Sequence, residues 1–288
     1  MPSLIDLRRR IRSVQNTEQI TKAMKMVSAA KLRRAQQAVV NARPYATLLE
    51  SMIGSVLAHG GEDTSIGSNP LLEQRECRSL RLLVLAGEKG LCGSFNSNVL
   101  KAGVQFADDR AGQVVEYELL GRKAVEFFSK RGQRTAGSWE QVFAHVEYGT
   151  AEVVATNAMR SFRNGEVDEV WILYNRFENV LRQDTTLEKL LPIVPPQASD
   201  RVLGGYEYEQ PPEQLLGTLL PKRVVTRVHL AMLDSAAAEH AARMTAMDSA
   251  TRNAGEVLEK LRLHLNRVRQ ASITTEIIEI VSGATALE

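Results

Sequence analysis

Residues 222–288 read KRVVTRVHLAMLDSAAAEHAARMTAMDSATRNAGEVLEKLRLHLNRVRQASITTEIIEIVSGATALE. This stretch of 67 residues follows Pro221, the last proline of the chain, and its only glycines are Gly255 and Gly283. A helix from residue 222 to residue 282 would be ~90 Å long at 1.5 Å per residue, whereas a domain of this size is ~40 Å across. We therefore expect a rod that another segment of the chain, or another protein, must cover.

Apolar side chains recur along this stretch at alternating spacings of three and four. The series has thirteen positions, namely Leu230, Leu233, Ala237, His240, Met244, Met247, Thr251, Ala254, Leu258, Leu261, Leu265, Val268 and Ser272. All of them are apolar except His240, Thr251 and Ser272, which makes ten of thirteen. A sustained alternation of this kind is typical of a coiled coil. Six alanines in the middle would let a second helix approach closely: Ala236, Ala237, Ala238, Ala241, Ala242 and Ala246.

The N-terminal segment is the natural partner for this rod. Neither proline nor glycine lies between Pro2 and Pro44, and the helical pattern continues from Leu4 to Leu57. We expect its small or flexible side chains to face the partner helix, namely Ala23, Met24, Met26, Val27, Ala29 and Ala30. The two rods are expected to pair antiparallel. The C-terminal rod would then extend ~30 Å further, with an exposed apolar end that needs a cover. That end contains Ile273, Ile277, Ile278, Ile280 and Val281.

The middle of the chain alternates between strand and helix patterns. Strands are predicted at 80–86, 114–120, 170–174 and 186–193, and helices up to Phe106, at 122–131 and at 151–163. This alternation indicates a mostly parallel α/β sheet. The predicted organisation is an N-terminal coiled-coil helix (1–58), a linker (59–78), a central α/β domain (79–194), a second linker (195–212) and a C-terminal coiled-coil helix (213–288).

Composition narrows the function classes. The chain has 288 residues, 44% of them hydrophobic, a net charge of +2 and two cysteines, which form no disulfide framework or zinc motif. No apolar run is long enough to span a membrane. Nine basic residues against two acidic ones in residues 1–34 make the N-terminal helix basic. That helix could bind DNA phosphates or an acidic protein surface, and a solvated face is the simplest interpretation of Arg8 to Arg10.

The segment from Gly87 to Ser94 follows the first predicted strand, where α/β sheets often bind phosphate. It lacks the ending of a P-loop and the dinucleotide glycine spacing, so we interpret its glycines as a strand-to-helix turn. Cys92 has no histidine partner that the sequence identifies, which favours a structural cysteine. A stand-alone nucleotide-dependent α/β enzyme and a DNA-binding coiled-coil protein remain the alternatives.

Four blocks of the sequence carry a family resemblance. They are residues 20–33 (ITKAMKMVSAAKLR), 90–96 (GLCGSFN), 239–247 (EHAARMTAM) and 269–284 (RQASITTEIIEIVSGA). In this order they resemble the γ subunit of F-type ATP synthases, although Ser94 replaces a usual glycine and Glu88-Lys89 stands for a usual Asp-Arg. The resemblance implies an antiparallel coiled coil of the two termini with a central Rossmann-like α/β domain.

The resemblance also implies a role. Such a chain is the central stalk that turns inside a catalytic head of three α and three β subunits, while its foot binds the ε subunit and the membrane c-ring, coupling ion flow to ATP synthesis. It binds no cofactor, nucleic acid or metal, is not an enzyme on its own, and lies peripherally on the cytoplasmic face of the bacterial inner membrane. The matching rotor–stator contact residues are Met24, Lys25, Arg269, Gln270 and Thr274. Arg243 and Glu276 would support the helix pair or rotor, and Tyr206, Tyr208 and Glu209 would contact the ε subunit.

Overall fold

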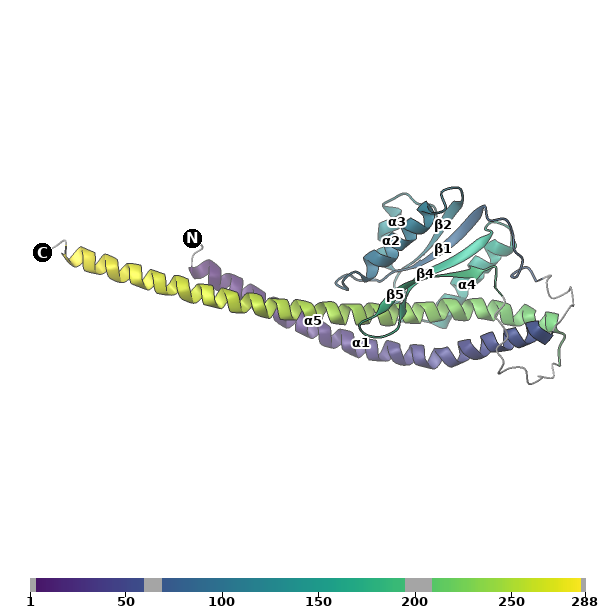
Figure 1. The fold of residues 1–288 in the computed structure, drawn as a ribbon, viewed down its shortest axis with the longest axis horizontal. Helices are drawn as coiled ribbons and strands as arrows, with labels where there is room; N and C mark the ends of the chain where they lie inside the picture. Colours follow the sequence, from purple (N-terminus) through teal and green to yellow (C-terminus); the bar gives the residue numbers. More distant parts are fainter. Residues whose placement is uncertain (1–3, 60–68, 195–208, 286–288) are drawn as a thin grey trace. The chain divides into compact units, whose positions relative to one another are not determined.

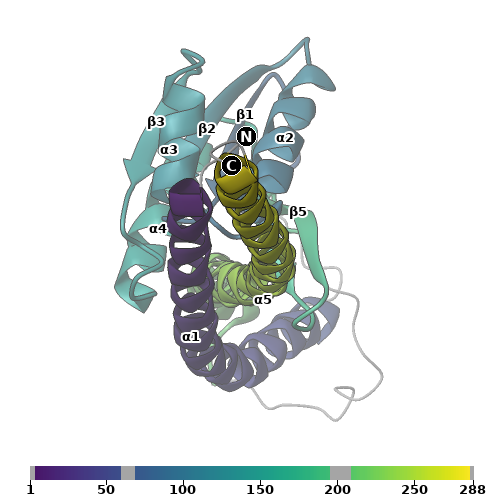
Figure 2. The same ribbon diagram turned by 90° about the vertical axis from the view of Figure 1, so that its left-hand side faces the viewer.

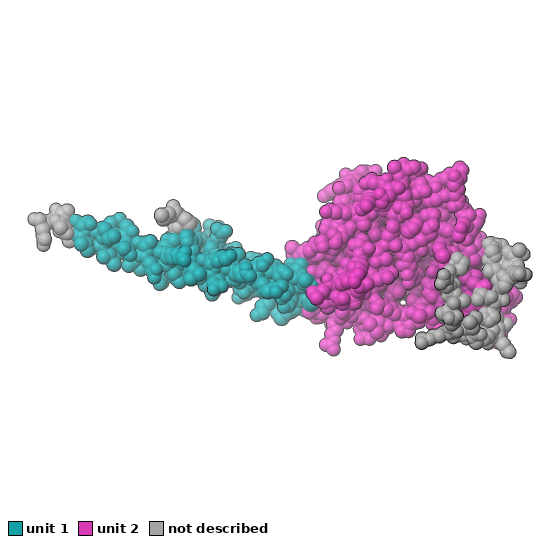
Figure 3. All heavy atoms as spheres, viewed as in Figure 1, with its two compact units in different colours: residues 1–28, 244–288 teal, residues 29–243 magenta. Residues whose placement is uncertain are grey.

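The structure is a computed structural model that describes residues 4–59, 69–194 and 209–285. It contains two compact units, shown in different colours in Figure 3. Unit 1 consists of residues 1–28 and 244–288, and unit 2 of residues 29–243. Two long helices, α1 (Leu4–His59) and α5 (Pro212–Thr285), contribute residues to both. Because α5 begins at Pro212, Pro221 lies inside the helix rather than before it.

Unit 2 contains a five-stranded sheet in the order β3-β2-β1-β4-β5. The strands are β1 (Ser79–Leu85), β2 (Val114–Leu120), β3 (Thr135–Trp139), β4 (Glu169–Phe177) and β5 (Gln183–Leu191). The first four strands are parallel, and β5 pairs with β4 antiparallel. Three helices connect them: α2 (Phe95–Asp108), α3 (Arg122–Ser129) and α4 (Tyr148–Arg163). The predicted fold, an α/β sheet with two long terminal helices, is confirmed.

The sheet separates two apolar cores, because alternate side chains of a strand point to opposite faces. Leu82 and Val84 of β1 pack with α2 and α3, while Leu83 and Leu85 pack with α4 and with parts of α1 and α5. Figure 1 shows α2 and α3 on one face of the sheet and α4 with α5 on the other. Strand β1 is therefore buried on both faces and apolar apart from Ser79 and Arg81, as the sequence predicts.

Strand β3 is the element that the sequence analysis missed. Its sequence, TAGSW, has small residues and no apolar run, and none of its five side chains is buried. An edge strand of this kind is set by pairing with β2 rather than by its own propensity. By contrast, the predicted strand 114–120 matches β2 at both ends.

Unit 1 is a pair of antiparallel helical segments, 4–28 of α1 and 244–285 of α5. Thr251 donates its hydroxyl to the hydroxyl of Thr21 at 2.8 Å, and Lys25 Nζ lies 2.5 Å from Asp248 Oδ1. From residue 256 onwards, the only described side chains that are not exposed belong to the predicted seam: Leu258, Leu261, Leu265, Val268 and Ser272. The seam predicted for this part of α5 is confirmed.

The prediction of which α1 side chains face α5 is wrong for most of the residues that it named. Met26 and Val27 are 61% and 57% exposed, and Ala23 and Ala30 are exposed as well. The residues of α1 in unit 1 that are buried or half-buried are Leu4, Leu7, Ile11, Val14, Gln15, Glu18, Thr21, Met24, Lys25 and Ser28, and all but Gln15 and Met24 are spaced by three and four from Leu4. Steps of three and four from Leu4 lead to the polar residues Glu18, Thr21, Lys25 and Ser28. The heptad register, and not the local density of apolar side chains, therefore decides which side of α1 faces α5.

The end of α5 extends beyond the described part of α1. The pairs Thr21–Thr251 and Lys25–Asp248 place Leu4 level with about residue 269, so α5 continues for about 25 Å beyond it. Figure 1 shows the C-terminal end of α5 running past the N-terminal end of α1, and Figure 2 shows the same two ends facing the viewer. All described side chains from Ile273 to Ser282 are exposed.

Candidate functional sites

The loop between β1 and α2 lies at the carboxyl edge of the sheet and is shaped by its glycines. Gly93 has φ of +58°, a left-handed conformation that glycine adopts without strain. The backbone N–H of Gly87 donates to Asn96 Oδ1 at 2.8 Å, and Asn96 Nδ2 donates to the Lys89 carbonyl at 3.2 Å. These bonds hold the loop against the start of α2.

Two side chains of α5 fill the space beside this loop. Arg243 donates from Nε and Nη2 to the Gly90 carbonyl at 3.3 Å, and from Nη2 to the Lys89 carbonyl at 3.3 Å. The same Nη2 lies 2.5 Å from Glu239 Oε1, and both residues are buried. We call this arrangement of Glu239, Arg243 and the loop residues Gly87, Lys89 and Gly90 the crevice contact. It joins two blocks that carried the sequence resemblance, and it places Arg243 against the α/β domain.

Neither Cys92 nor His240, both next to the crevice contact, is set up for catalysis. Burial raises the pKa of the Cys92 thiol, which disfavours the thiolate that a nucleophile needs. The Cys92 sulfur accepts a hydrogen bond from Asn96 Nδ2 at 3.2 Å. Burial first, and then the charges of Arg243 and Lys31, lower the pKa of His240 to about 4. The ring is therefore neutral near pH 7.

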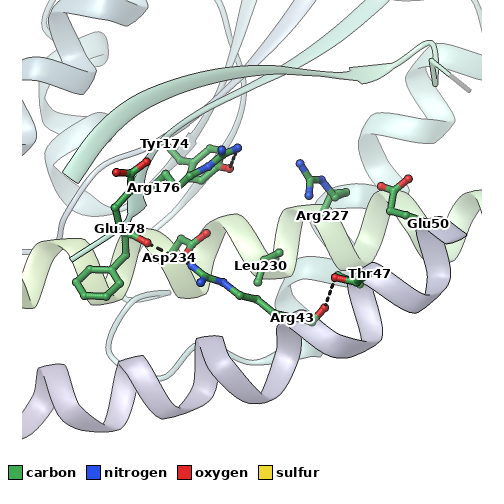
Figure 4. A pocket seen from close by; sticks show the side chains of 11 residues that line it. Arg43, Thr47, Glu50, Tyr174, Arg176, Glu178, Arg227, Leu230 and Asp234 are labelled. Atoms are coloured by element: carbon green, nitrogen blue, oxygen red, sulfur yellow. Dashed lines mark hydrogen bonds and ion pairs between the residues drawn. The ribbon is translucent and has the colours of Figure 1, made fainter. Parts of the chain in front are cut away.

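A groove of about 580 Å³ lies between α1, α5 and the end of β4 (Figure 4). It is lined by Arg43, Ala46, Thr47, Glu50, Tyr174, Arg176, Phe177, Glu178, Arg227, Leu230 and Asp234. Arg43 reaches from α1 to the buried Asp234 of α5 at 3.3 Å, and it also donates to the Phe177 carbonyl at 3.2 Å. Burial raises the pKa of Asp234, and the positive charge of Arg43 opposes that shift.

The groove's other charges are paired as well. Arg227 bonds to Glu188 of β5, and Arg176 lies 4.0 Å from the same carboxylate. Arg223 of α5 donates from Nε to both oxygens of Glu50 at 2.9 Å. Each arginine that lines the groove has a carboxylate partner, so the groove offers no unpaired cationic side chain to a small anion. The ion pairs instead connect α1 and α5 to each other and to the sheet.

The predicted contact residues in α1 lie in or beside the seam of unit 1. Met24 is half-buried, and Lys25 keeps 44% of its side chain exposed while pairing with Asp248. The hydrogen bond from Lys25 is the main cause that lowers the pKa of Asp248. The sequence analysis assigned Lys25 to a contact with another subunit and named no partner for it within the chain, where Asp248 pairs with it.

The predicted contact residues near the end of α5 are all exposed, namely Arg269, Gln270, Thr274 and Glu276. The Thr274 hydroxyl donates to the Gln270 carbonyl at 2.9 Å, and Ser272 donates to Glu276 at 3.2 Å. Both bonds lie within α5. Next to these polar groups, Ile277, Ile278 and Ile280 are 55%, 58% and 72% exposed, an apolar surface that a partner could cover.

The predicted foot contacts are only partly visible. Glu209 is exposed, and Tyr206 and Tyr208 lie outside the described residues. In the part of the chain that the structure describes, no helix is long and apolar enough to cross a membrane.

Comparisons with known proteins agree with these features. The family model for ATP synthase matches residues 3–287. The ATP synthase gamma chain of Solibacter usitatus is 52% identical over 288 residues, and that of Geotalea daltonii is 46% identical over 291 residues; both alignments span the whole of each chain. This chain belongs to the gamma-chain family of F-type ATP synthases. The membership favours the central-stalk interpretation over the DNA-binding and stand-alone enzyme alternatives.

Solved structures support the fold of this family member. A chain of the Tetrahymena thermophila mitochondrial ATP synthase central stalk and c-ring has a TM-score of 0.61 and 24% identity, covering 80% of this chain and 99% of that one. A chain of the Euglena gracilis mitochondrial ATP synthase has a TM-score of 0.66 and 18% identity, covering 99% and 94%. At these identities the likeness shows the fold alone.

Proposed function

We propose that this gamma-chain family member is the rotating shaft of an ATP synthase, coupling proton flow through a membrane rotor to ATP synthesis or hydrolysis in the head. The observation that carries the proposal is the end of α5, where the described residues 273–282 are all exposed and five of them are large and apolar. A helix end of this kind is stable when a collar formed by other subunits surrounds it.

A shaft can drive a reaction without performing chemistry. To move a site from 1:99 to 99:1 between two conformations requires about 5.5 kcal/mol of differential interaction. An asymmetric rod supplies it by contacting each of three head sites differently, and turning permutes those contacts. Many contacts on a stiff helix matter more here than one special residue.

The partners follow from this role. Three α and three β subunits would surround the shaft and meet Met24, Lys25, Arg269, Gln270 and Thr274. Arg243 and Glu276 would support the shaft itself. The ε subunit would contact the region of Tyr206, Tyr208 and Glu209, and the c-ring would turn the foot. The chain would bind no cofactor and would lie on the cytoplasmic face of a bacterial inner membrane, held there by its partners.

Rotation can be observed directly. The chain would be co-expressed with its α and β subunits, the head fixed to glass, and a bead attached through a cysteine introduced at the exposed position Asp109. We expect one chain for three copies of each head subunit, and stepwise rotation that depends on ATP. A complex that hydrolyses ATP while the bead stays still would contradict the proposal, as would ATP hydrolysis by the isolated chain.

Deleting residues 273–288 tests the proposed collar. The described part of this segment buries no side chain, so the midpoint of thermal unfolding of the isolated chain should change by less than about 2 °C. Coupled ATP synthesis by the assembled complex should fall severalfold, since the collar loses its apolar partner. The control deletes residues 286–288 only. Equal synthesis by the two truncated forms would show that the apolar end is not a bearing surface.

A further inference from the structure

The carboxyl edge of this sheet has the geometry of a ligand site. In doubly wound sheets, ligands bind outside the carboxyl ends of the strands at the point where the strand order reverses. Here that point lies between β1 and β4, since β1 leads to α2 on one face and α4 leads into β4 from the other. The start of α2 and the residue Asn175 of β4 meet at this edge, where Asn175 Nδ2 donates to the Phe95 carbonyl at 3.2 Å.

Part of the chain itself occupies the space beside this edge. The Glu239 carboxyl group lies so close to Gly87 that a Cβ atom there would be 2.9 Å from Glu239 Cδ and 3.0 Å from Oε2. Arg243, one helical turn further along α5, donates to the two loop carbonyls, which belong to neither helix nor strand. Glu239 and Arg243 therefore sit against the loop as a bound ligand would.

The crevice contact differs in kind from the apolar contacts around it. Ala237, Ala238 and Ala241 of α5 are fully buried, but small apolar side chains pack without a directional preference. The guanidinium of Arg243 is planar and its donors have fixed directions, so it satisfies the carbonyls in one orientation of the helix. Apolar burial holds α5 close, whereas the crevice contact sets its rotation about its own axis and its position along that axis.

We propose that Glu239 and Arg243 are positioning residues that lock α5 against rotation on the α/β domain, so that torque passes between them through the crevice contact. This inference rests on the shaft function proposed above, and it adds the place where torque enters the helix. The groove pairs Arg43–Asp234 and Arg227–Glu188 hold the same helix further along, but Arg43 remains half exposed to water, which weakens its hold.

The seating of α5 can be tested on the isolated full-length chain. Hydrogen exchange of the amides of residues 88–96 would be compared in wild type, Gly87→Ala and Arg243→Met. The first variant inserts a methyl group against Glu239, and the second keeps the apolar stem but removes every donor. We expect at least tenfold faster exchange in both. Gly149→Ala is the matched control, because a Cβ there meets no atom within 4 Å. Unchanged exchange in both variants would overturn the inference.

Torque transfer requires the assembled complex in inverted membrane vesicles. The readout is the ratio of ATP-driven ion pumping to ATP hydrolysis at equal subunit content, because a smaller amount of intact complex lowers both quantities together and leaves their ratio unchanged. We expect this ratio to fall severalfold in Gly87→Ala and in Arg243→Met, and Arg243→Lys to retain part of it. The double variant Gly87→Ala with Glu239→Asp should recover, since the shorter acid withdraws from the added methyl group.

The outcomes separate this inference from the proposed function. Faster exchange with an unchanged pumping ratio would overturn the torque role and leave the shaft function standing. The torque role is also overturned if the double variant fails to recover while Glu239→Asp alone pumps normally. A wild-type complex that does not rotate would instead refute the shaft function, and the exchange experiment would still decide how α5 is seated.

Discussion

The single helix α5 lies in two different surroundings. Between Val224 and Arg243, in unit 2, fifteen of its residues are buried, and its neighbours are the apolar core, a sheet and α4. Between Gln270 and Ser282, in unit 1, every residue except Ser272 is exposed. Residues 256–269, which precede this end, bury or half-bury one line of side chains and expose the rest. The same helix is therefore stabilised by tertiary packing in unit 2 and by a single seam in unit 1, and its last described turns bury no side chain.

This difference implies that the two units contribute differently to the stability of the chain. Unit 2 contains both apolar cores and so accounts for most of the free energy of unfolding. The seam of unit 1 includes polar side chains, Thr21 with Thr251 and Lys25 with Asp248, which specify register at the expense of stability. Local opening should occur first in unit 1.

The largest expected effect comes from truncating one apolar side chain of α5 in each surrounding. Met232 is fully buried in unit 2, and Met232→Ala should lower the free energy of unfolding by about 2–5 kcal/mol. Leu258 is 4% exposed in the seam, where two isolated helices can close over the gap, so Leu258→Ala should cost about 2 kcal/mol or less. Urea unfolding measures the loss of stability caused by Met232→Ala, and amide exchange over residues 244–272 measures the loss caused by Leu258→Ala. Equal losses in global stability would mean that the two units unfold as one.

The sequence predicted those elements whose signal is local. The seam of α5 follows from spacing alone, and β2 (VVEYELL) is rich in β-branched, aromatic and aliphatic side chains. Strand β3 could not be predicted, because TAGSW gains its conformation only by pairing with β2. The face of α1 was mispredicted because its apolar residues lie on several sides, and only the register from Leu4 selects one.

The crevice contact shows a second limit of the sequence. Gly90 and Arg243 are 153 positions apart, and nothing local in either segment identifies the other. The spacing of Glu239 and Arg243, one helical turn, does predict an ion pair within α5. That the pair would face the loop after β1 depends on how α5 packs against the sheet, which the sequence does not state.

An effect of intermediate size is expected for the dependence of stability on pH. It concerns His240 in unit 2, which faces Arg243 of α5 and Lys31 of α1. Its pKa is about 4 in the folded chain and near 6.5 when unfolded. Because the unfolded chain takes up the proton first, stability should fall as the pH is lowered from 6.5 to 4. Allowing for hydration of the half-buried ring, we expect a loss of about 2 kcal/mol. His240→Gln should flatten this slope in urea unfolding measured between pH 4 and 7, and an unchanged slope would assign the acid sensitivity to carboxylates.

The smallest effect on the chain itself is expected at Lys25 in unit 1. Lys25→Glu places two carboxylates together where Lys25 and Asp248 now pair, so amide exchange around residues 21–25 and 248–252 should become about two- to fivefold faster. The charge-swapped double variant, Lys25→Glu with Asp248→Lys, should restore the wild-type exchange rate. Lys22→Glu is the matched control, because Lys22 is one turn away and exposed.

The same variants separate the two roles that Lys25 can have. A side chain that only pairs with Asp248 needs just the opposite charge on the other helix, so the swap would restore coupling in the assembled complex together with the exchange rate. Lys25 also keeps 44% of its side chain exposed, enough to meet an acidic partner at the same time. In that case the swap restores the exchange rate but not the ratio of pumping to hydrolysis, because the partner then faces a glutamate. We expect this second pattern, and recovery of both quantities would confine Lys25 to the helix pair.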